Sequence, residues 1–396
     1  IQTEIDKMKL KLKVAIVYGD NLLDQKHDLK KMKVKEWETG KTLPNSCLSI
    51  NAYLGAKGIQ KSLEYGADIV ITGRCVDSAM VLGPLMHEFQ WKNQDYDLLA
   101  SGSLAGHIIE CGAQCTGGNF TDWKQVKDFD NIGFPIVEVE ENGNFIVSKP
   151  PDTGGLVSFG TVSEQFLYEL GNPNAYLLPD VICDFTNVNI TEIAKDQVLI
   201  TGAKGRPPTE NYKVSATYMD GYRAVATLVI GGKNSATKAD IISDAILKKT
   251  KIMIQKAGME KFKDTHLSKI GTNSIYGEHK EGKNSKEVVM RLVVTHKKKE
   301  ALLLFSKEIA QAVTGMAAGV INYLGGRPSV SPSIKLFSFL VPKTLINHEI
   351  MIDNSKIVFD TKILDKSYKT TDISLIEMDK DNFSMYNSKV ALEKLA

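Results

Sequence analysis

Residues 66–89, GADIVITGRCVDSAMVLGPLMHEF, decide the fold class of this chain. The run at 69–72 (IVIT) is short, apolar and mostly β-branched, which predicts a buried strand. The turn at 73–78 (GRCVDS) leads into a predicted helix over 79–89. A strand that passes through a short turn into a helix is the repeating unit of parallel α/β sheets.

The same unit precedes this stretch. Residues 13–18 (KVAIVY) predict a buried strand that ends at Gly19 and Asp20, and small and apolar residues recurring at helical spacing predict a helix over 48–65. The order strand, helix, strand, turn, helix therefore predicts a Rossmann-like parallel sheet layered with helices. We expect this α/β domain to occupy residues 1–188.

The second half of the chain has a different pattern. Residues 212–230 alternate around Asp220 and Gly221, a pair favoured in tight turns, and predict a β-hairpin. Beyond it we expect helices at 236–257 and 301–324 and strands at 268–276, 288–295 and 334–341. From the second arm of the hairpin this order is βαββαβ, which predicts a ferredoxin-like α+β domain over 189–345. Residues 346–396 are polar and mixed and predict a C-terminal tail or linker.

Composition excludes some classes of function. The 396 residues carry 49 basic and 47 acidic side chains, so a net charge of +2 gives no electrostatic reason to expect nucleic acid. No apolar run approaches the roughly 20 residues that cross a membrane as a helix. Five cysteines, an odd number in a long chain, favour a reducing compartment. We therefore expect an intracellular protein of the cytoplasm or the mitochondrial matrix.

Residues 100–123 (ASGSLAGHIIECGAQCTGGNFTDW) combine glycines with titratable side chains. His107, Glu110, Cys111 and Cys115 are suitable metal ligands, but the spacing matches neither Cys-x2-Cys nor HExxH, so we expect no metal. A thiolate–imidazole pair of Cys111 and His107 is possible but unusual within one helix. General acid–base chemistry by His107 and Glu110 is the catalytic prediction. The alternative is a core histidine bonded to a backbone carbonyl.

Substrate contacts are predicted at strand ends and glycine turns. Open α/β sheets bind ligands beyond the carboxyl ends of their strands, and arginines in glycine turns can clamp a carboxylate or phosphate. Neither GxGxxG nor a P-loop occurs, so no cofactor is evident. The alternatives are that Asp20 is a helix N-cap and that the arginines only pack and bond to nearby carbonyls. The predicted substrate-binding set is Asp20, Asn51, Arg74, Asp77, Ser78, Gln114, Thr116, Gly117, Gly118, Thr153, Gly154, Gly155 and Arg327.

Several long motifs resemble one family. They occur in order, and the likeness covers roughly residues 10 to 345. The motifs are NAYLGA (51–56), ITGRCVDSAMVLGPLMHEF (71–89), SLAGHIIECGAQCTGGNFTDW (103–123), KPPDTGGLVS (149–158), LLPDVICDFT (177–186), KVSATYMDGYR (213–223) and GGRPSVSP (325–332). Together they resemble the acyclic terpene utilisation (AtuA) family. The resemblance also implies a further α/β stretch before 13–18, including a glycine-rich first turn, which this sequence lacks.

The resemblance implies a place in the catabolism of acyclic terpenes through branched acyl-CoA thioesters. We expect a protein that acts on an acyl-CoA or a carboxylate, as a lyase or hydratase if it is an enzyme, with a CoA thioester as possible substrate. The alternative is a non-catalytic subunit that binds a carboxylase or a small AtuA-like domain. A homo-oligomer or a complex with such a small domain is the expected assembly.

Overall fold

The computed structural model describes residues 1–272, 274, 277, 285–323, 325–352, 355–359 and 371. The chain divides into two units that interleave along the sequence. Unit 1 comprises Ile1–Leu43, Ser49–Ala216 and the chain from Phe337, and unit 2 comprises Pro44–Leu48 and Thr217–Leu336. The sequence instead predicts divisions at 188 and 345. The mixed α/β class is confirmed, whereas the Rossmann-like and ferredoxin-like assignments stay predictions.

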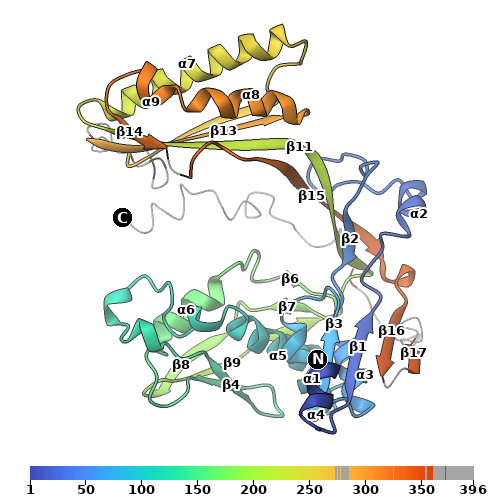
Figure 1. Ribbon diagram of the computed structural model, residues 1–396. Coiled ribbons are helices and arrows are strands. Elements are labelled where there is room, and N and C mark those ends of the chain that lie inside the picture. The colour runs from blue at the N-terminus through green and yellow to red at the C-terminus, as the bar shows by residue number, and fades with distance from the viewer. Residues whose placement is uncertain are drawn as a thin grey trace. The chain divides into compact units, whose positions relative to one another are not determined.

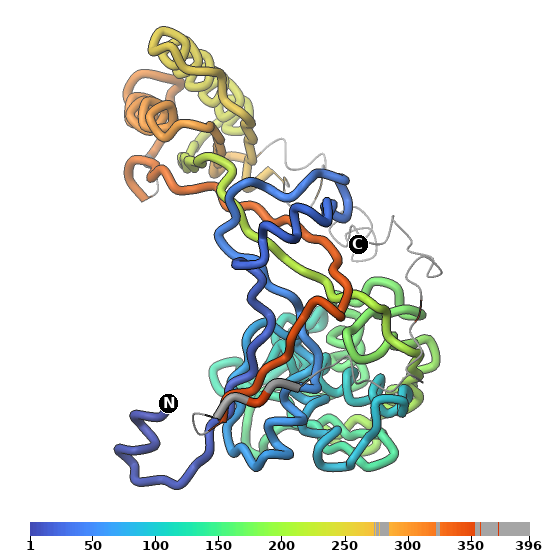
Figure 2. The backbone as a smooth tube through the Cα atoms, turned by 90° about the vertical axis from the view of Figure 1, so that its right-hand side faces the viewer, coloured from blue at the N-terminus to red at the C-terminus, as the bar shows by residue number. Residues whose placement is uncertain are grey.

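The strands predicted at 13–18 and 69–72 form the parallel pair of unit 1. β1 (Val14–Tyr18) pairs with β3 (Ile69–Thr72), with Val14 opposite Ile69. The predicted tail contributes to the same sheet: β16 (His348–Ile352) is antiparallel to β1, and β17 (Ser355–Phe359) pairs with β16. Figure 2 shows β16 running beside β1. β16 alternates buried and half-buried residues, and Ile350 packs with Ala15 and Ala67, so this strand is not a tail. Apart from Thr371, residues 360–396 of the predicted tail lie outside the described residues.

The helix predicted over 48–65 is wrong in its first half. Residues 49–52 form β2 (Ser49–Ala52), which pairs with β11, and only Lys57–Glu64 is helical, as α3. The alternating burial of β2 is typical of a strand. The residues on either side of it also bond to the backbone around β11: Leu48 N donates to Thr217 O, and Tyr53 N donates to Lys213 O. Pairing with a distant strand overrides the local helical pattern.

The other helices of unit 1 are α1 (Gln2–Lys7), α2 (Lys26–Lys31), α4 (Ala79–Glu88), α5 (Tyr96–Ile109) and α6 (Phe159–Leu167). α5 is buried from Leu99 to Ile108 and forms the centre of the core, because small and apolar residues cover its whole circumference. It ends at Ile109, and Gly112–Gln114 forms a separate 3₁₀ turn.

Two antiparallel sheets complete unit 1 (Figure 1). One has the order β4 (Ile136–Val139), β5 (Phe145–Ser148), β9 (Gln197–Thr201), β8 (Asn189–Ala194). The other has the order β10 (Lys204–Arg206), β7 (Ile182–Asp184), β6 (Tyr176–Leu177). Unit 1 therefore mixes parallel and antiparallel pairing.

The secondary structure of unit 2 begins within β11 (Asn211–Gly231), whose residues 211–216 belong to unit 1. The further elements of unit 2 follow in the order α7 (Ser235–Lys256), β12 (Asp264–Ile270), β13 (Glu287–His296), α8 (Lys299–Ile309), α9 (Ala312–Gly315) and β14 (Val320–Tyr323). The sheet order is β12-β13-β11-β14, and β15 (Val330–Pro342) also pairs with β11. One face of this sheet packs against α7 and α8 through residues such as Leu228, Met290, Ile242 and Phe305. The predicted 301–324 helix ends early, and the predicted end of the 268–276 strand lies outside the described residues.

The predicted hairpin at Asp220 and Gly221 is also wrong, because β11 is one continuous strand of 21 residues. Gly221 has a φ of +81°, and the pairing with β13 begins at the next residue, Tyr222, which lies opposite His296. A Cβ at Gly221 would lie 2.6 Å from His296 O, so this glycine permits close approach of two strands. The Asp220 carboxylate forms ion pairs with Lys263 and Lys335.

Candidate functional site

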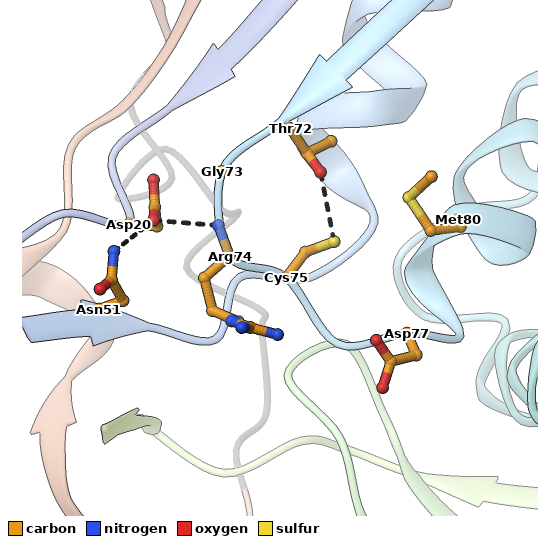
Figure 3. Close-up of a pocket in the computed structure, with 8 residues that line it drawn as sticks. All are labelled: Asp20, Asn51, Thr72, Gly73, Arg74, Cys75, Asp77 and Met80. Atoms are coloured by element: carbon orange, nitrogen blue, oxygen red, sulfur yellow. Dashed lines mark hydrogen bonds between the residues drawn. The ribbon is translucent and has the colours of Figure 1, made fainter. Parts of the chain in front are cut away.

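A pocket of about 420 Å³ opens where β1 and β3 of unit 1 end (Figure 3). Four of the predicted substrate-binding residues, Asp20, Asn51, Arg74 and Asp77, meet there, although they come from three separate segments. The carboxyl ends of parallel strands are the usual ligand position in open α/β sheets. The full lining is Asp20, Asn51, Thr72, Gly73, Arg74, Cys75, Asp77 and Met80.

Asp20 organises this pocket. Its side chain is buried, and Oδ2 accepts hydrogen bonds from Asn51 Nδ2 at 2.8 Å and from the Arg74 backbone N–H at 3.0 Å (Figure 3). A Cβ at Gly73 would lie 2.0 Å from Asp20 Oδ1, so only glycine lets the carboxylate reach the turn. Asp20 caps no helix, since α2 begins only after Gln25. Its carboxylate therefore fixes the GRC turn.

Arg74 presents an exposed guanidinium beside this fixed turn. Its Cζ lies 5.3 Å from the centre of the Tyr53 ring, and it forms no ion pair within the described part of the chain. In Figure 3 the guanidinium extends away from the Asp20 carboxylate, on the side of Asp77, which is also exposed. A guanidinium that lies at a pocket and is not paired with a described carboxylate suits an anionic ligand.

The cysteines near the pocket are poor nucleophiles. Burial raises the pKa of the Cys75 thiol, against a smaller opposing effect of Thr72, whose Oγ1 lies 3.6 Å from Cys75 Sγ. Burial likewise raises the pKa of Cys111, and it raises the pKa of Cys115 to about 12. Since the thiolate is the reactive form, these thiols stay protonated and inert at neutral pH. Among the described residues, no three His, Cys, Asp or Glu side chains are placed to hold a metal ion.

His107 of α5 and Glu110, the residue directly after α5, lie side by side, but neither lines the pocket. His107 Nδ1 is 3.2 Å from Glu110 Oε1, although the angles are not those of a hydrogen bond, and Nε2 is 3.2 Å from Phe166 O. His107 is 1 % exposed and packs against Tyr176. His107 thus lies beside Glu110, as the predicted pair requires, and it is also a core histidine bonded to a backbone carbonyl, as the alternative requires. The catalytic role of the pair stays a prediction.

The two glycine turns at 116–118 and 153–155 lie together, outside the pocket lining. Leu156 N donates to Thr116 O at 2.8 Å, which joins them. The amides that we expect to hold an anion have partners inside the protein: Gly117 N donates to Gln114 O, Gly118 N to Ala113 O, Gly154 N to Asn131 O and Gly155 N to Lys127 O. The hydroxyl groups of Thr116 and Thr153 also donate to backbone carbonyls. These turns connect loops within unit 1.

Three further predicted residues lie apart from the pocket. Ser78 is buried under Gly106 of α5, and Gln114 sits in the 3₁₀ turn after α5. Arg327 belongs to unit 2.

The family model described as acyclic terpene utilisation family protein AtuA matches residues 1–352. This chain belongs to the AtuA family. No curated protein matches the sequence. Membership indicates a role related to terpene utilisation. In the part of the chain that the structure describes, none of its helices is both long and apolar enough to span a membrane.

The AtuA chain also contains a partly buried cluster of charged residues, Lys57, Asp180 and Lys343, that sequence reasoning missed. Asp180 Oδ2 accepts a hydrogen bond from Ala56 N at 2.8 Å, and its carboxylate lies so close to Gly55 that a Cβ there would be 2.3 Å away. Burial raises the pKa of Asp180 and lowers the pKa of both Lys57 and Lys343 to about 8, with Asp180 opposing the shift of each lysine. Lys343 Nζ also donates to Pro179 O. No local pattern signals this cluster, because it joins residues far apart in sequence.

Proposed function

We propose that this AtuA-family protein binds a branched carboxylate, free or as its CoA thioester, and converts it during the degradation of acyclic terpenes. One observation carries the proposal: an exposed arginine, which makes no ion pair with any described carboxylate, lies at a pocket whose backbone is fixed by the buried Asp20. A guanidinium presents a planar fork of donors that matches two oxygens of a carboxylate or phosphate. Family membership supports the terpene context.

A lyase or hydratase is the reaction class that we propose for this pocket. Such enzymes move a proton to or from a carbon or oxygen of the substrate, which requires a titratable group within reach of the ligand. The geometry favours Asp77 over His107 for this role, because Asp77 lines the pocket and is exposed, whereas His107 is buried beside Phe166. The alternative function as a non-catalytic subunit, and the expected homo-oligomer or small partner domain, stay predictions.

Ligand binding tests the proposal through thermal stability. Isovalerate and isovaleryl-CoA, used as probes at about 100 times their Kd, are each expected to stabilise the native protein by about 3 kcal/mol. Arg74→Ala removes the proposed clamp and should weaken binding of both probes at least about tenfold, which is the effect of losing about 1.4 kcal/mol. Differential scanning fluorimetry over a ligand titration measures both effects.

Arg291→Ala is the matched control, because it removes an exposed arginine from β13 in unit 2 and should leave both titrations unchanged. If the unmodified protein shows no shift with either probe, the proposed function is wrong. If Arg74→Ala binds both probes as tightly as the unmodified protein, the pocket is not where they bind.

A further inference from the structure

The Tyr53 ring carries a second cation besides Arg74. Lys213 Nζ lies 5.4 Å from the ring centre, and Arg74 Cζ lies 5.3 Å from it. The three residues come from the turn after β3, from the end of β2 and from β11, all within unit 1. The Tyr53 backbone N–H donates to Lys213 O at 2.9 Å, which fixes the ring beside this lysine. Two positive charges are thus gathered on one aromatic side chain next to the pocket.

Neither charge is neutralised by the protein where the chain is described. Lys213 is exposed and, like Arg74, makes no ion pair with a described carboxylate. Two like charges near one ring repel each other, and an exposed cation–π contact contributes only about 0.5–1 kcal/mol. An arrangement that keeps both cations without a carboxylate is best suited to a ligand that brings negative charge.

We propose that Arg74 and Lys213, held by Tyr53, form a subsite for a phosphate group of the ligand. This inference rests on the proposed function and narrows it from a free carboxylate to a thioester of coenzyme A. A carboxylate carries one negative charge, whereas a phosphate monoester carries close to two at neutral pH and has three acceptor oxygens. Arginine binds phosphate oxygens in a bidentate manner and lysine binds them as a point charge, so the two side chains complement each other.

Isothermal titration calorimetry at low ionic strength tests the subsite with three probes: coenzyme A, inorganic pyrophosphate and isovalerate. Lys213→Gln should weaken binding of coenzyme A about tenfold or more, because a charged hydrogen-bond donor to phosphate is lost. Lys213→Arg keeps the positive charge and should bind coenzyme A about as tightly as the unmodified protein. Tyr53→Leu keeps both charges but removes the ring that positions them, and should weaken coenzyme A binding as well. Isovalerate binding should be the same in Lys213→Gln as in the unmodified protein.

Lys124→Gln is the matched control. Lys124 also stacks on an exposed aromatic ring of unit 1, with its Nζ 5.7 Å from the centre of Trp123, but neither residue lines the pocket. Coenzyme A should bind this variant with unchanged affinity. Circular dichroism verifies that every variant is folded.

The outcomes separate the two proposals. If pyrophosphate binds as tightly as coenzyme A and loses affinity in Lys213→Gln, the result supports a phosphate subsite that also accepts a free anion. If coenzyme A binds more tightly than pyrophosphate and loses affinity in Lys213→Gln, the result supports a thioester of coenzyme A as the ligand. Equal coenzyme A affinity in Lys213→Gln and the unmodified protein overturns the subsite, and so does binding of isovalerate alone, while the proposed function stands. Failure of all three probes to bind overturns both.

Discussion

Asp180→Asn is expected to destabilise the protein by about 2 kcal/mol at neutral pH, because the charged acceptor of the Ala56 N–H becomes neutral and the favourable interaction of the carboxylate with Lys57 and Lys343 is lost. Asn keeps the size of the side chain and an oxygen that can accept the hydrogen bond from Ala56 N, so the change isolates the charge. Lys57 and Lys343 would then lose the carboxylate that now opposes the lowering of their pKa. Urea denaturation at pH 7 measures the loss as a lower midpoint with an unchanged slope.

The pH dependence of this loss follows from the cited shifts. The pKa of each lysine is about 8 in the folded chain and 10.5 ordinarily, so between these values the unfolded chain binds more protons and stability rises with pH. Above pH 8 the folded lysines are neutral in both proteins, and the difference between them should shrink. Below the raised pKa of Asp180 its carboxyl is protonated, and the difference should shrink again.

Asp97→Asn is the control for this experiment. Asp97 also accepts a hydrogen bond from a backbone amide, Gly205 N at 2.9 Å, and binds a lysine, Lys204, at 2.9 Å, but this pair is more than half exposed. Exposed pairs contribute about 0–1 kcal/mol, so the control should change stability little. An equally small effect of Asp180→Asn at pH 7 would show that the cluster of Lys57, Asp180 and Lys343 has no dominant role in stability.

Gly106→Ala is expected to destabilise unit 1 by about 3 kcal/mol, although the helix propensity of alanine is better than that of glycine by about 1 kcal/mol. A Cβ at this position of α5 would lie 2.7 Å from Ser78 Cα and 2.8 Å from Ser78 O. These are backbone atoms at the start of α4, so relief requires the two helices to separate. Thermal and urea unfolding of the variant measure the loss.

Gly102→Ala tests whether position, rather than loss of glycine, causes that effect. Gly102 lies one turn earlier in α5, and its added Cβ would meet side-chain atoms, Leu82 Cδ1 at 2.9 Å and Trp91 Cζ3 at 3.0 Å. Side-chain ends can shift more easily than backbone, so a loss of at most about 1 kcal/mol is expected. A neutral Gly106→Ala variant would mean that α4 and α5 are packed less closely than described.

Local sequence predicted part of the fold well. The strands at 13–18 and 69–72 and the helix at 79–89 have strong patterns of their own, and all three occur. The same patterns, with the rule that ligands bind at the carboxyl ends of parallel strands, pointed to Asp20, Arg74 and Asp77, which meet in one pocket. The predictions for β2, β11 and β16 failed, because each of these segments owes its form to a strand far away in sequence.

By itself, then, the sequence determined the α/β class, the family and the segments that end at the pocket, because periodicity and turn residues act over a few neighbouring positions. Only the tertiary structure decided that 348–352 is a strand, that Asp180 contacts Gly55 and interacts with two lysines, and that Lys213 shares the Tyr53 ring with Arg74. These contacts join residues far apart along the chain. Their energies come from burial and charge at close range, which exist only once the chain has folded.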